Sequence, residues 1–115
     1  MSDNNELSAT VMNLYAAISD QSQSMLHAAK QGDWDGLCKA EESCSRLILE
    51  LQTVKQAREI ELNEEERGKH IAYLKTILAD DAAIRNITEP RLQQLEEFLR
   101  AASNTHRLSN SYGSN

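Results

Sequence analysis

The sequence contains few of the residues that interrupt helices or favour sheets. It has four glycines, one proline and no extended run of β-branched residues among its 115 positions. Strong helix formers, chiefly alanine, leucine, glutamate and glutamine, are abundant instead. We therefore predict an all-helical fold. A chain of this length is expected to form a single domain with a modest core.

Long apolar runs and clusters of basic residues are also absent. No stretch approaches the roughly 20 apolar residues that cross a bilayer. The N-terminus has neither the basic first region nor the apolar second region of a signal peptide. Twelve lysines and arginines stand against eighteen aspartates and glutamates, which gives a formal net charge of −6. Such a chain repels phosphate backbones. We expect a cytoplasmic protein that neither inserts into a membrane nor binds nucleic acid directly.

The two cysteines fall on one predicted helix. Cys38 and Cys44 are six residues apart, which corresponds to roughly 9 Å along a helix axis. A disulfide requires α-carbons within about 7 Å of each other. We therefore expect both thiols to be free and to act as small buried hydrophobic side chains, as is usual in a reducing compartment.

The residue groups that catalysis and metal binding require are missing from the pattern. His27, His70 and His106 fall on different predicted elements, and none has a ligand or nucleophile at i+3 or i+4 that completes a metal or catalytic pattern. There is no glycine-rich phosphate-binding loop. We therefore expect no catalytic residues, no metal site and no cofactor.

Apolar residues recur every three or four positions along most of the chain, which is the period of an amphipathic helix. The pattern predicts helices over residues 5–31, 34–58, 64–86 and 89–103, and a flexible polar tail over 104–115. Pro90 starts the last helix, because proline is tolerated in a first turn. We expect one domain over 1–103, an antiparallel bundle of three long helices plus a shorter fourth.

Each predicted helix has one face on which apolar residues gather. On the first helix Ser22 fills one step of this face, and on the second Glu41 occupies its centre. The predicted inward-facing residues are Leu7, Val11, Leu14, Tyr15, Ile18, Met25, Leu26 and Ala29 on the first helix; Trp34, Leu37, Cys44, Ile48 and Leu51, flanked by Leu47 and Val54, on the second; Ile71, Leu74, Ile77, Leu78 and Ile84 on the third; and Leu92, Leu95, Phe98, Leu99 and Ala102 on the fourth.

Two helix boundaries have recognisable capping signals. Gly32 is expected to end the first helix, since glycine readily adopts the left-handed conformation, and Asp33 to cap the second. Asn63, with Glu66 three residues later, forms a capping box that begins the third helix.

Several residues depart from the simple pattern of a buried stripe. A lone buried carboxylate is costly, so Glu41 must be paired, or lie at the edge of the bundle or of a binding groove. Leu49 and Tyr73 are apolar residues on the flanks of their helices, which suggests a groove for a partner helix. The predicted partner-binding residues are Glu41, Leu47, Leu49, Leu51, Tyr73 and Ile77.

The run Gly32-Asp33-Trp34-Asp35, followed by Leu37, Glu41 and Ile48, resembles the FliT family of flagellar export chaperones. The segments RLQQLEEFL and RLSNSYG extend the resemblance, which covers residues 14–113. Gly36 and Cys44 stand where a family member can carry leucine and tyrosine. Gly32, Asp33 and Trp34 then form a structural corner, in which the indole fills the gap where two helices meet.

The resemblance implies a non-enzymatic chaperone of type III export. Its client would be the C-terminal helical region of the filament-cap protein FliD, which it keeps from assembling early and delivers to the export gate. The resemblance implies further partners in components of the export gate and the export ATPase, and in the flagellar master transcription activator. The C-terminal segment of such proteins partly covers the binding surface. The corresponding autoinhibitory residues here are Leu95, Phe98, Leu99, Leu108 and Tyr112.

Other classes of function stay open at this point. A helical-bundle adaptor or regulator-binding protein without an export client would have the same pattern. A small helical enzyme would need a converging pocket, for which Lys39, Arg46 and Arg58 are the candidates, although a solvated face paired with glutamates is the simpler interpretation. The sequence leaves a homodimer open.

Overall fold

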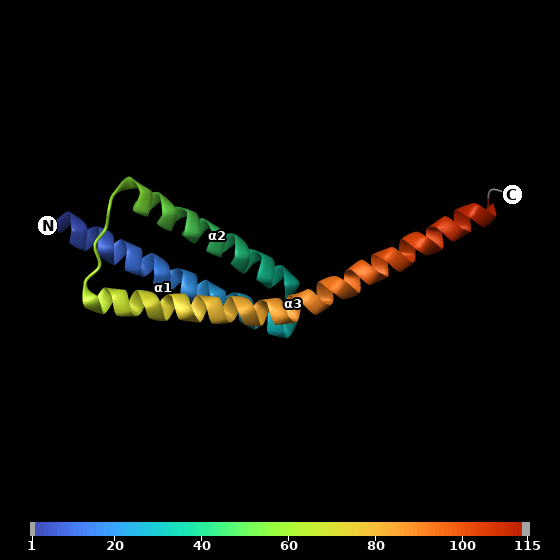
Figure 1. The fold of residues 1–115 in the computed structure, drawn as a ribbon, viewed down its shortest axis with the longest axis horizontal. Coiled ribbons are helices and arrows are strands. Elements are labelled where there is room, and N and C mark those ends of the chain that lie inside the picture. The colour runs from blue at the N-terminus through green and yellow to red at the C-terminus, as the bar shows by residue number, and fades with distance from the viewer. Residues whose placement is uncertain (1, 114–115) are drawn as a thin grey trace. The chain divides into compact units, whose positions relative to one another are not determined.

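The computed structural model describes the backbone of residues 2–113 and the side chains of residues 4–104. Its elements are the helices α1 (Ser2–Gln31), α2 (Trp34–Ala57) and α3 (Glu64–Gly113) (Figure 1). The described residues contain no strand, and the prediction of an all-helical fold is confirmed. The chain divides into two compact units, one up to Ile84 and one from Arg85 onward.

The prediction of a separate fourth helix is wrong, because α3 continues through Pro90. Proline removes one N–H and crowds the carbonyl four residues earlier, at a cost of about 3 kcal/mol. A break would instead leave unpaired amides and carbonyls at two new helix ends. The polar segment predicted as a tail is helical as far as Gly113.

In the first unit, the chain runs along α1, back along α2 and forward again along α3. Lys55 Nζ, near the end of α2, lies 3.4 Å from the Tyr15 hydroxyl in the first half of α1. The rings of Tyr15 and His70, at the start of α3, have centroids 4.3 Å apart. Ser22 and Asp80 make the next contact between α1 and α3. Consequently α1 and α3 run parallel, and α2 runs antiparallel to both.

The core of this unit is built mainly from α1. Its central buried residues are Val11, Leu14, Tyr15, Ile18 and Leu51, and the partly buried residues packed against them are Met12, Cys44, Leu47, Val54, Ile60, Tyr73 and Ile77. The predicted face of α1 is confirmed for its central residues, and Ser22 is buried within it. Ser8 and Ser19 are buried as well, and the apolar pattern gave no sign of them.

The predicted end of α1 at Gly32 and the predicted cap of α2 at Asp33 are confirmed. Gly32 has a φ of 70°, which places it in the left-handed region. Its N–H donates to the Ala29 carbonyl over 3.2 Å, and the Asp33 N–H donates to the Ala28 carbonyl over 2.9 Å. These two bonds form a Schellman motif, which satisfies carbonyls at the end of α1. Asp33 caps α2 by accepting the Gly36 N–H over 3.0 Å.

The connection between α2 and α3 is held by a capping box at the start of α3 and by hydrogen bonds to α1. The predicted capping box is confirmed: the Glu66 N–H donates to Asn63 Oδ1 over 2.8 Å, and the Asn63 N–H donates to Glu66 Oε1 over 3.0 Å. The side-chain amide of Asn4 makes two bonds with the backbone of Glu61, at 3.3 and 3.4 Å. This clamp ties the connection to the start of α1.

The inward face of α2 lies to one side of the predicted stripe. Leu37 and Leu51 are buried as expected, but the residues between them that pack inward include Ala40 and Leu47. Glu41 is exposed, so its predicted place at the centre of the inward face is wrong. Because Leu37 and Leu51 fit either orientation, the packing against α1 decides how the helix is rotated.

The first part of α3 also turns a different face inward from the one that the sequence predicted. Ile77 and Ile84 face inward as predicted, whereas Ile71, Leu74 and Leu78 are 52%, 38% and 67% exposed, which contradicts the prediction. The positions next to the inward-facing apolar residues are taken by His70 and Asp80, because Tyr15 and Ser22 of α1 provide partners for these polar side chains.

Between residues 85 and 113, the part of the second unit that the structure describes, there is one helical segment. Its large apolar residues were predicted to face inward, and this is wrong. Leu92, Leu95, Phe98 and Leu99 are all exposed, by 45% to 70%. A single helix has no neighbour within the unit that could cover such a stripe.

Candidate partner-binding site

An apolar groove of about 380 Å³ lies among the three helices of the first unit. On each of α2 and α3 the lining residues are spaced three, four and seven apart, so each helix presents one continuous face to the groove. The lining residues are Ser22 and Met25 of α1; Glu41, Cys44, Ser45 and Ile48 of α2; and Ile77, Leu78, Asp81 and Ile84 of α3.

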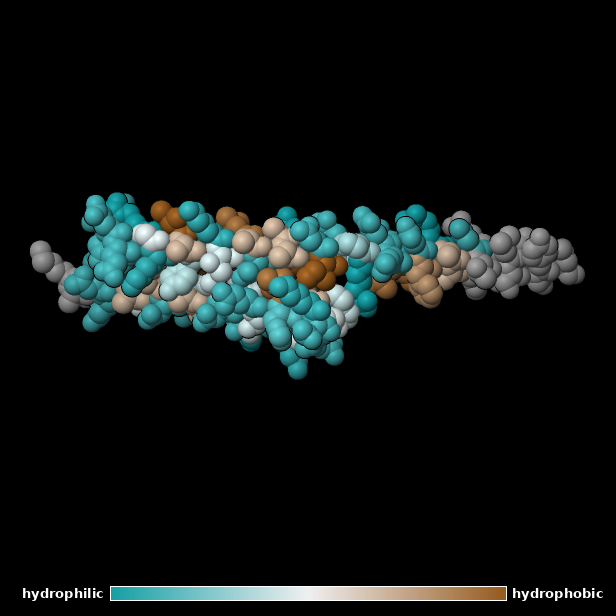
Figure 2. All heavy atoms as spheres, turned by 90° about the horizontal axis from the view of Figure 1, so that it is seen from below, coloured by the Kyte–Doolittle hydropathy of each residue, from teal (hydrophilic) through white to brown (hydrophobic). Residues whose placement is uncertain are grey.

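The groove has a buried base and exposed walls. Ser22 and Ile84 are buried, and Cys44 is half-buried, so these residues form the base. Ile48 and Leu78 are 40% and 67% exposed and form apolar walls on α2 and α3. Exposed large apolar side chains on two facing helices are typical of a surface that binds another helix. The face in Figure 2 shows apolar side chains gathered in patches between polar ones.

The rim of the groove carries negative charge. Glu41 on α2 and Asp81 on α3 are both exposed and line the same groove. Burial raises the pKa of the Cys44 thiol, and the nearby Glu41 carboxylate raises that pKa further. The thiol therefore stays protonated at neutral pH and contributes apolar surface to the groove.

The predicted partner-binding residues fall in three different places. Glu41 and Ile77 line the groove. Leu47, Leu51 and Tyr73 belong to the core cluster. Leu51 is 8% exposed, so this conformation presents almost none of its surface to a partner.

Leu49 lies outside both the groove and the core cluster. Its side chain is 63% exposed, and it is not among the residues that line the groove. The role of these residues in binding stays a prediction.

Sequence reasoning missed several lining residues. Ile48 and Leu78 were assigned to inward-facing stripes, and Met25 was treated as ordinary core. Asp81 was not considered. The available signal was that α3 has more apolar residues than one buried face can accommodate, which leaves some of them for a second face.

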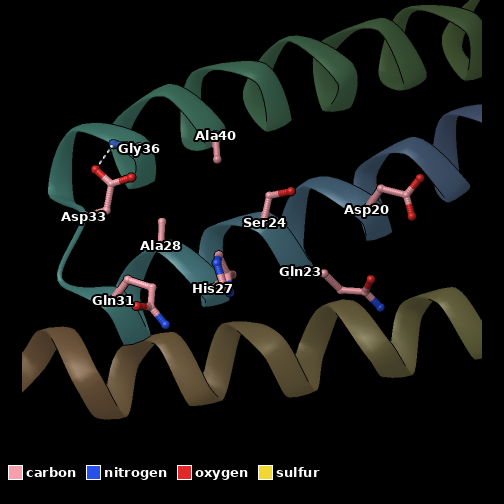
Figure 3. Close-up of a pocket in the computed structure, with 9 residues that line it drawn as sticks. All are labelled: Asp20, Gln23, Ser24, His27, Ala28, Gln31, Asp33, Gly36 and Ala40. Atoms are coloured by element: carbon pink, nitrogen blue, oxygen red, sulfur yellow. Dashed lines mark hydrogen bonds between the residues drawn. The ribbon is translucent and has the colours of Figure 1, made fainter.

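A second, more polar hollow of about 460 Å³ lies where α1 ends and α2 begins (Figure 3). Asp20, His27 and Gln31 line it from α1, while Asp33 and Gly36 line it from the start of α2. The Asp33 carboxylate is already engaged in capping, and a side chain at Gly36 would overlap it. The described residues contain no group of three potential metal ligands, here or elsewhere.

Three helices meet at a small polar cluster around Tyr15. Lys55 from α2 reaches its hydroxyl, and His70 from α3 stacks on its ring at 44° between planes. Burial lowers the pKa of His70 below its ordinary 6.5, and the positive charge of Lys55 lowers it further. His70 is therefore neutral at pH 7 and acts here as a packing residue.

Within the described residues, no helix includes a segment both apolar and long enough to pass through a membrane. Both cysteines are free, as predicted. Cys38 is exposed, however, so its predicted role as a buried hydrophobic residue is wrong.

The predicted autoinhibitory residues can be located only in part. Leu95, Phe98 and Leu99 lie in the second unit and are exposed. The side chains of Leu108 and Tyr112 lie outside the described residues. Autoinhibition stays a prediction.

The fold and the groove together define a small helical protein with an apolar surface suited to binding another helix. The sequence profile of the family described as "Flagellar protein FliT" matches residues 12–114, and the chain therefore belongs to the FliT family. The resemblance noted from the tryptophan corner is confirmed.

A solved structure gives the same result. The chain is similar to the crystal structure of flagellar protein FliT from Bordetella bronchiseptica, with a TM-score of 0.69 and 28% sequence identity. The match covers 76% of this chain and 97% of that one. No curated protein sequence matches the chain.

Proposed function

We propose that this protein is a flagellar export chaperone that binds the C-terminal helical region of the filament-cap protein FliD. Binding would keep the cap protein from assembling early and deliver it to the export gate. Membership of the FliT family supports the flagellar role. The groove among α1, α2 and α3 is the observation that carries the binding mechanism, because it presents exposed apolar side chains on two neighbouring helices.

The proposed activity is binding alone. A client helix would place apolar side chains, spaced three and four apart, between Ile48 and Leu78. Covering these walls removes apolar surface from water on both molecules, which drives association. No bond is made or broken, so no catalytic residue or cofactor is required.

Components of the export gate and export ATPase, and the flagellar master transcription activator, are further proposed partners. We propose that the apolar residues Leu95, Phe98 and Leu99 compete with these partners for the chaperone's binding surface. Their exposure supports this role, since a stripe of large apolar side chains is available for a transient contact.

Co-purification with the cap protein of the same organism tests the proposal. The chain should retain full-length cap protein and lose a version that lacks its C-terminal helices. If it retains neither protein, or both equally, the proposed client or the proposed binding region is wrong.

Two neighbouring residues of α2 locate the binding surface. Ile48 lines the groove, whereas the adjacent Leu49 does not, although both are exposed. Ile48→Asp should weaken client binding roughly tenfold or more, since it places a charge on the apolar wall. Leu49→Asp is the matched control for a new charge on this helix. Stronger loss from Leu49→Asp would move the binding surface to the outer face of α2, as the flank position of Leu49 first suggested.

A further inference from the structure

Two stretches of eight residues in α3 share one arrangement of apolar and charged side chains. The first octet, residues 71–78, has the sequence IAYLKTIL, and the second octet, residues 92–99, has the sequence LQQLEEFL. In both octets the first, fourth and eighth residues are apolar and the fifth is charged. These four positions are spaced three, four and seven apart, so they lie on one side of a helix. Each octet therefore presents an apolar face with a charge near its middle.

This face of the first octet is open to solvent. Its apolar residues Ile71, Leu74 and Leu78 are 52%, 38% and 67% exposed. Lys75 is exposed as well, and it is the only charged residue of the octet. Another face of the same stretch, which includes Ile77, packs against the core of the first unit. The first unit thus folds without covering the apolar face around Lys75.

The second octet, in the second unit, has the same face with the opposite charge. Leu92, Leu95 and Leu99 are 57%, 45% and 63% exposed, and Glu96 is exposed among them. The second octet contains two glutamates and no basic residue, whereas the first contains one lysine and no acidic residue. The two faces therefore match in spacing and are complementary in charge.

Both octets belong to one helix, α3. An unbroken helix cannot pack against a later part of itself, so a second octet that covers the first must come from another chain. We infer that a second copy of this protein covers the first octet with its own second octet, so that Lys75 of one copy faces Glu96 of the other. In a closed dimer with two-fold symmetry this contact is made twice, since each copy supplies both octets. The inference does not depend on the proposed client.

The two kinds of side chain have different roles in this contact. The apolar residues drive association, because covering them removes apolar surface from water on both copies. The charges determine which octets pair. Pairing two first octets would place lysine beside lysine, and pairing two second octets would place glutamate beside glutamate. Both arrangements are unfavourable, which leaves the pairing of a first octet with a second octet.

Sedimentation equilibrium of the full chain over a range of concentrations tests the inference. The unmodified chain should form a dimer. Lys75→Glu alone and Glu96→Lys alone should each weaken dimerisation roughly tenfold or more, because like charges then face each other at both contacts. Lys39→Glu is the matched control for the first variant. It makes the same change in net charge at an exposed lysine of α2, outside both octets, and it should dimerise like the unmodified chain.

A mixture of the two octet variants gives a second readout that does not depend on a loss. In a mixed dimer the Lys75→Glu chain meets opposite charges on the Glu96→Lys chain at both contacts. The mixture should therefore dimerise about as strongly as the unmodified chain, although each variant alone is mostly monomeric. A contact within one chain cannot produce this result. The substituted residues are exposed, so melting curves of the variants should match that of the unmodified chain.

The possible outcomes separate this inference from the proposed function. An unmodified chain that stays monomeric would overturn the inference and leave the proposed client untouched. A mixture that associates no better than either variant alone would show that the octets do not pair. Equal losses in Lys75→Glu and in the Lys39→Glu control would reduce the effect to net charge, which also overturns the pairing. A chain that dimerises as expected and fails to retain the cap protein would contradict the proposed function alone.

Discussion

Two neighbouring faces of the first part of α3 differ in a way that composition would not suggest. The face packed against α1 contains His70 and Asp80, while the exposed face beside it contains Ile71, Leu74 and Leu78. These polar residues are half-buried there because α1 supplies partners for them. Burial is therefore decided by what each residue meets across the interface, and hydrophobicity alone does not settle it.

The exposed apolar side chains lower the solubility of the protein, whereas the packed face does not. Isolated exposed apolar residues are ordinary, but several on one helix, beside a groove, are typical of an interaction surface. We interpret the packed face as responsible for stability and the exposed face as responsible for partner binding. The following predictions test that division.

The largest expected effect is on the free energy of unfolding, and it should differ between the packed face and the exposed face of α3. Ile84→Ala should lower the free energy of unfolding by about 3 kcal/mol, because it leaves a cavity at a buried site. Leu78→Ala, on the exposed face, should change it by less than about 0.5 kcal/mol. Urea denaturation followed by circular dichroism measures both values. Similar losses for the two variants would show that the exposed face also supports the fold.

Truncation after Ile87 tests whether the C-terminal segment competes for the binding surface. The shortened chain keeps Ile84 and should fold. It should bind the cap protein or export components more tightly by ~1–3 kcal/mol, the range of a typical coupling free energy. Isothermal titration of both chains against one partner measures the difference. Weaker binding by a folded truncated chain would make the segment part of the binding surface.

Replacement of Trp34 extends the comparison to the corner between α1 and α2. The indole is half-buried, whereas the corner prediction assumed a fully filled gap. Full burial would predict a loss of ~3–5 kcal/mol for Trp34→Ala, and half burial predicts about 2 kcal/mol. The midpoint and slope of urea denaturation give this value. An unchanged midpoint would point to a role for Trp34 in partner contact.

The smallest effect concerns the polar residue of the packed face. The pKa of His70 is below 6.5 in the folded chain, so the unfolded chain takes up a proton more readily. Stability should therefore be highest above pH 6.5, decline as the pH falls through that value, and level off below the folded pKa. His70→Gln should remove this part of the pH dependence. Denaturation midpoints between pH 5 and 8 for both chains provide the check, and parallel curves would contradict it.

The sequence was sufficient to predict those features that depend on residues close together in the chain. The caps at Gly32, Asp33 and Asn63 were predicted correctly, because each bond joins groups within a few positions of each other. The central stripe of α1 was also predicted correctly. Its central residues Val11, Leu14, Tyr15 and Ile18 are apolar and three or four positions apart, so one rotation of the helix buries them all.

The orientation of the other helices could not be read in this way. On α2, Leu37 and Leu51 fit a face that includes Glu41 and equally a face that includes Ala40 and Leu47. On α3, apolar residues cover more of the circumference than one interface buries. The periodicity of such helices is compatible with more than one rotation, and contacts with a neighbouring helix select among them.

The sequence by itself determined the helical fold, the caps at Gly32 and Asp33, and the family, since these rest on local propensities and on short motifs. Tertiary structure decided which faces pack and that Glu41 and Asp81 line one groove. The physical reason is that these features depend on residues that meet only when helices pack together. A carboxylate on α2 and another on α3, 40 positions apart in the chain, carry no common pattern in the sequence.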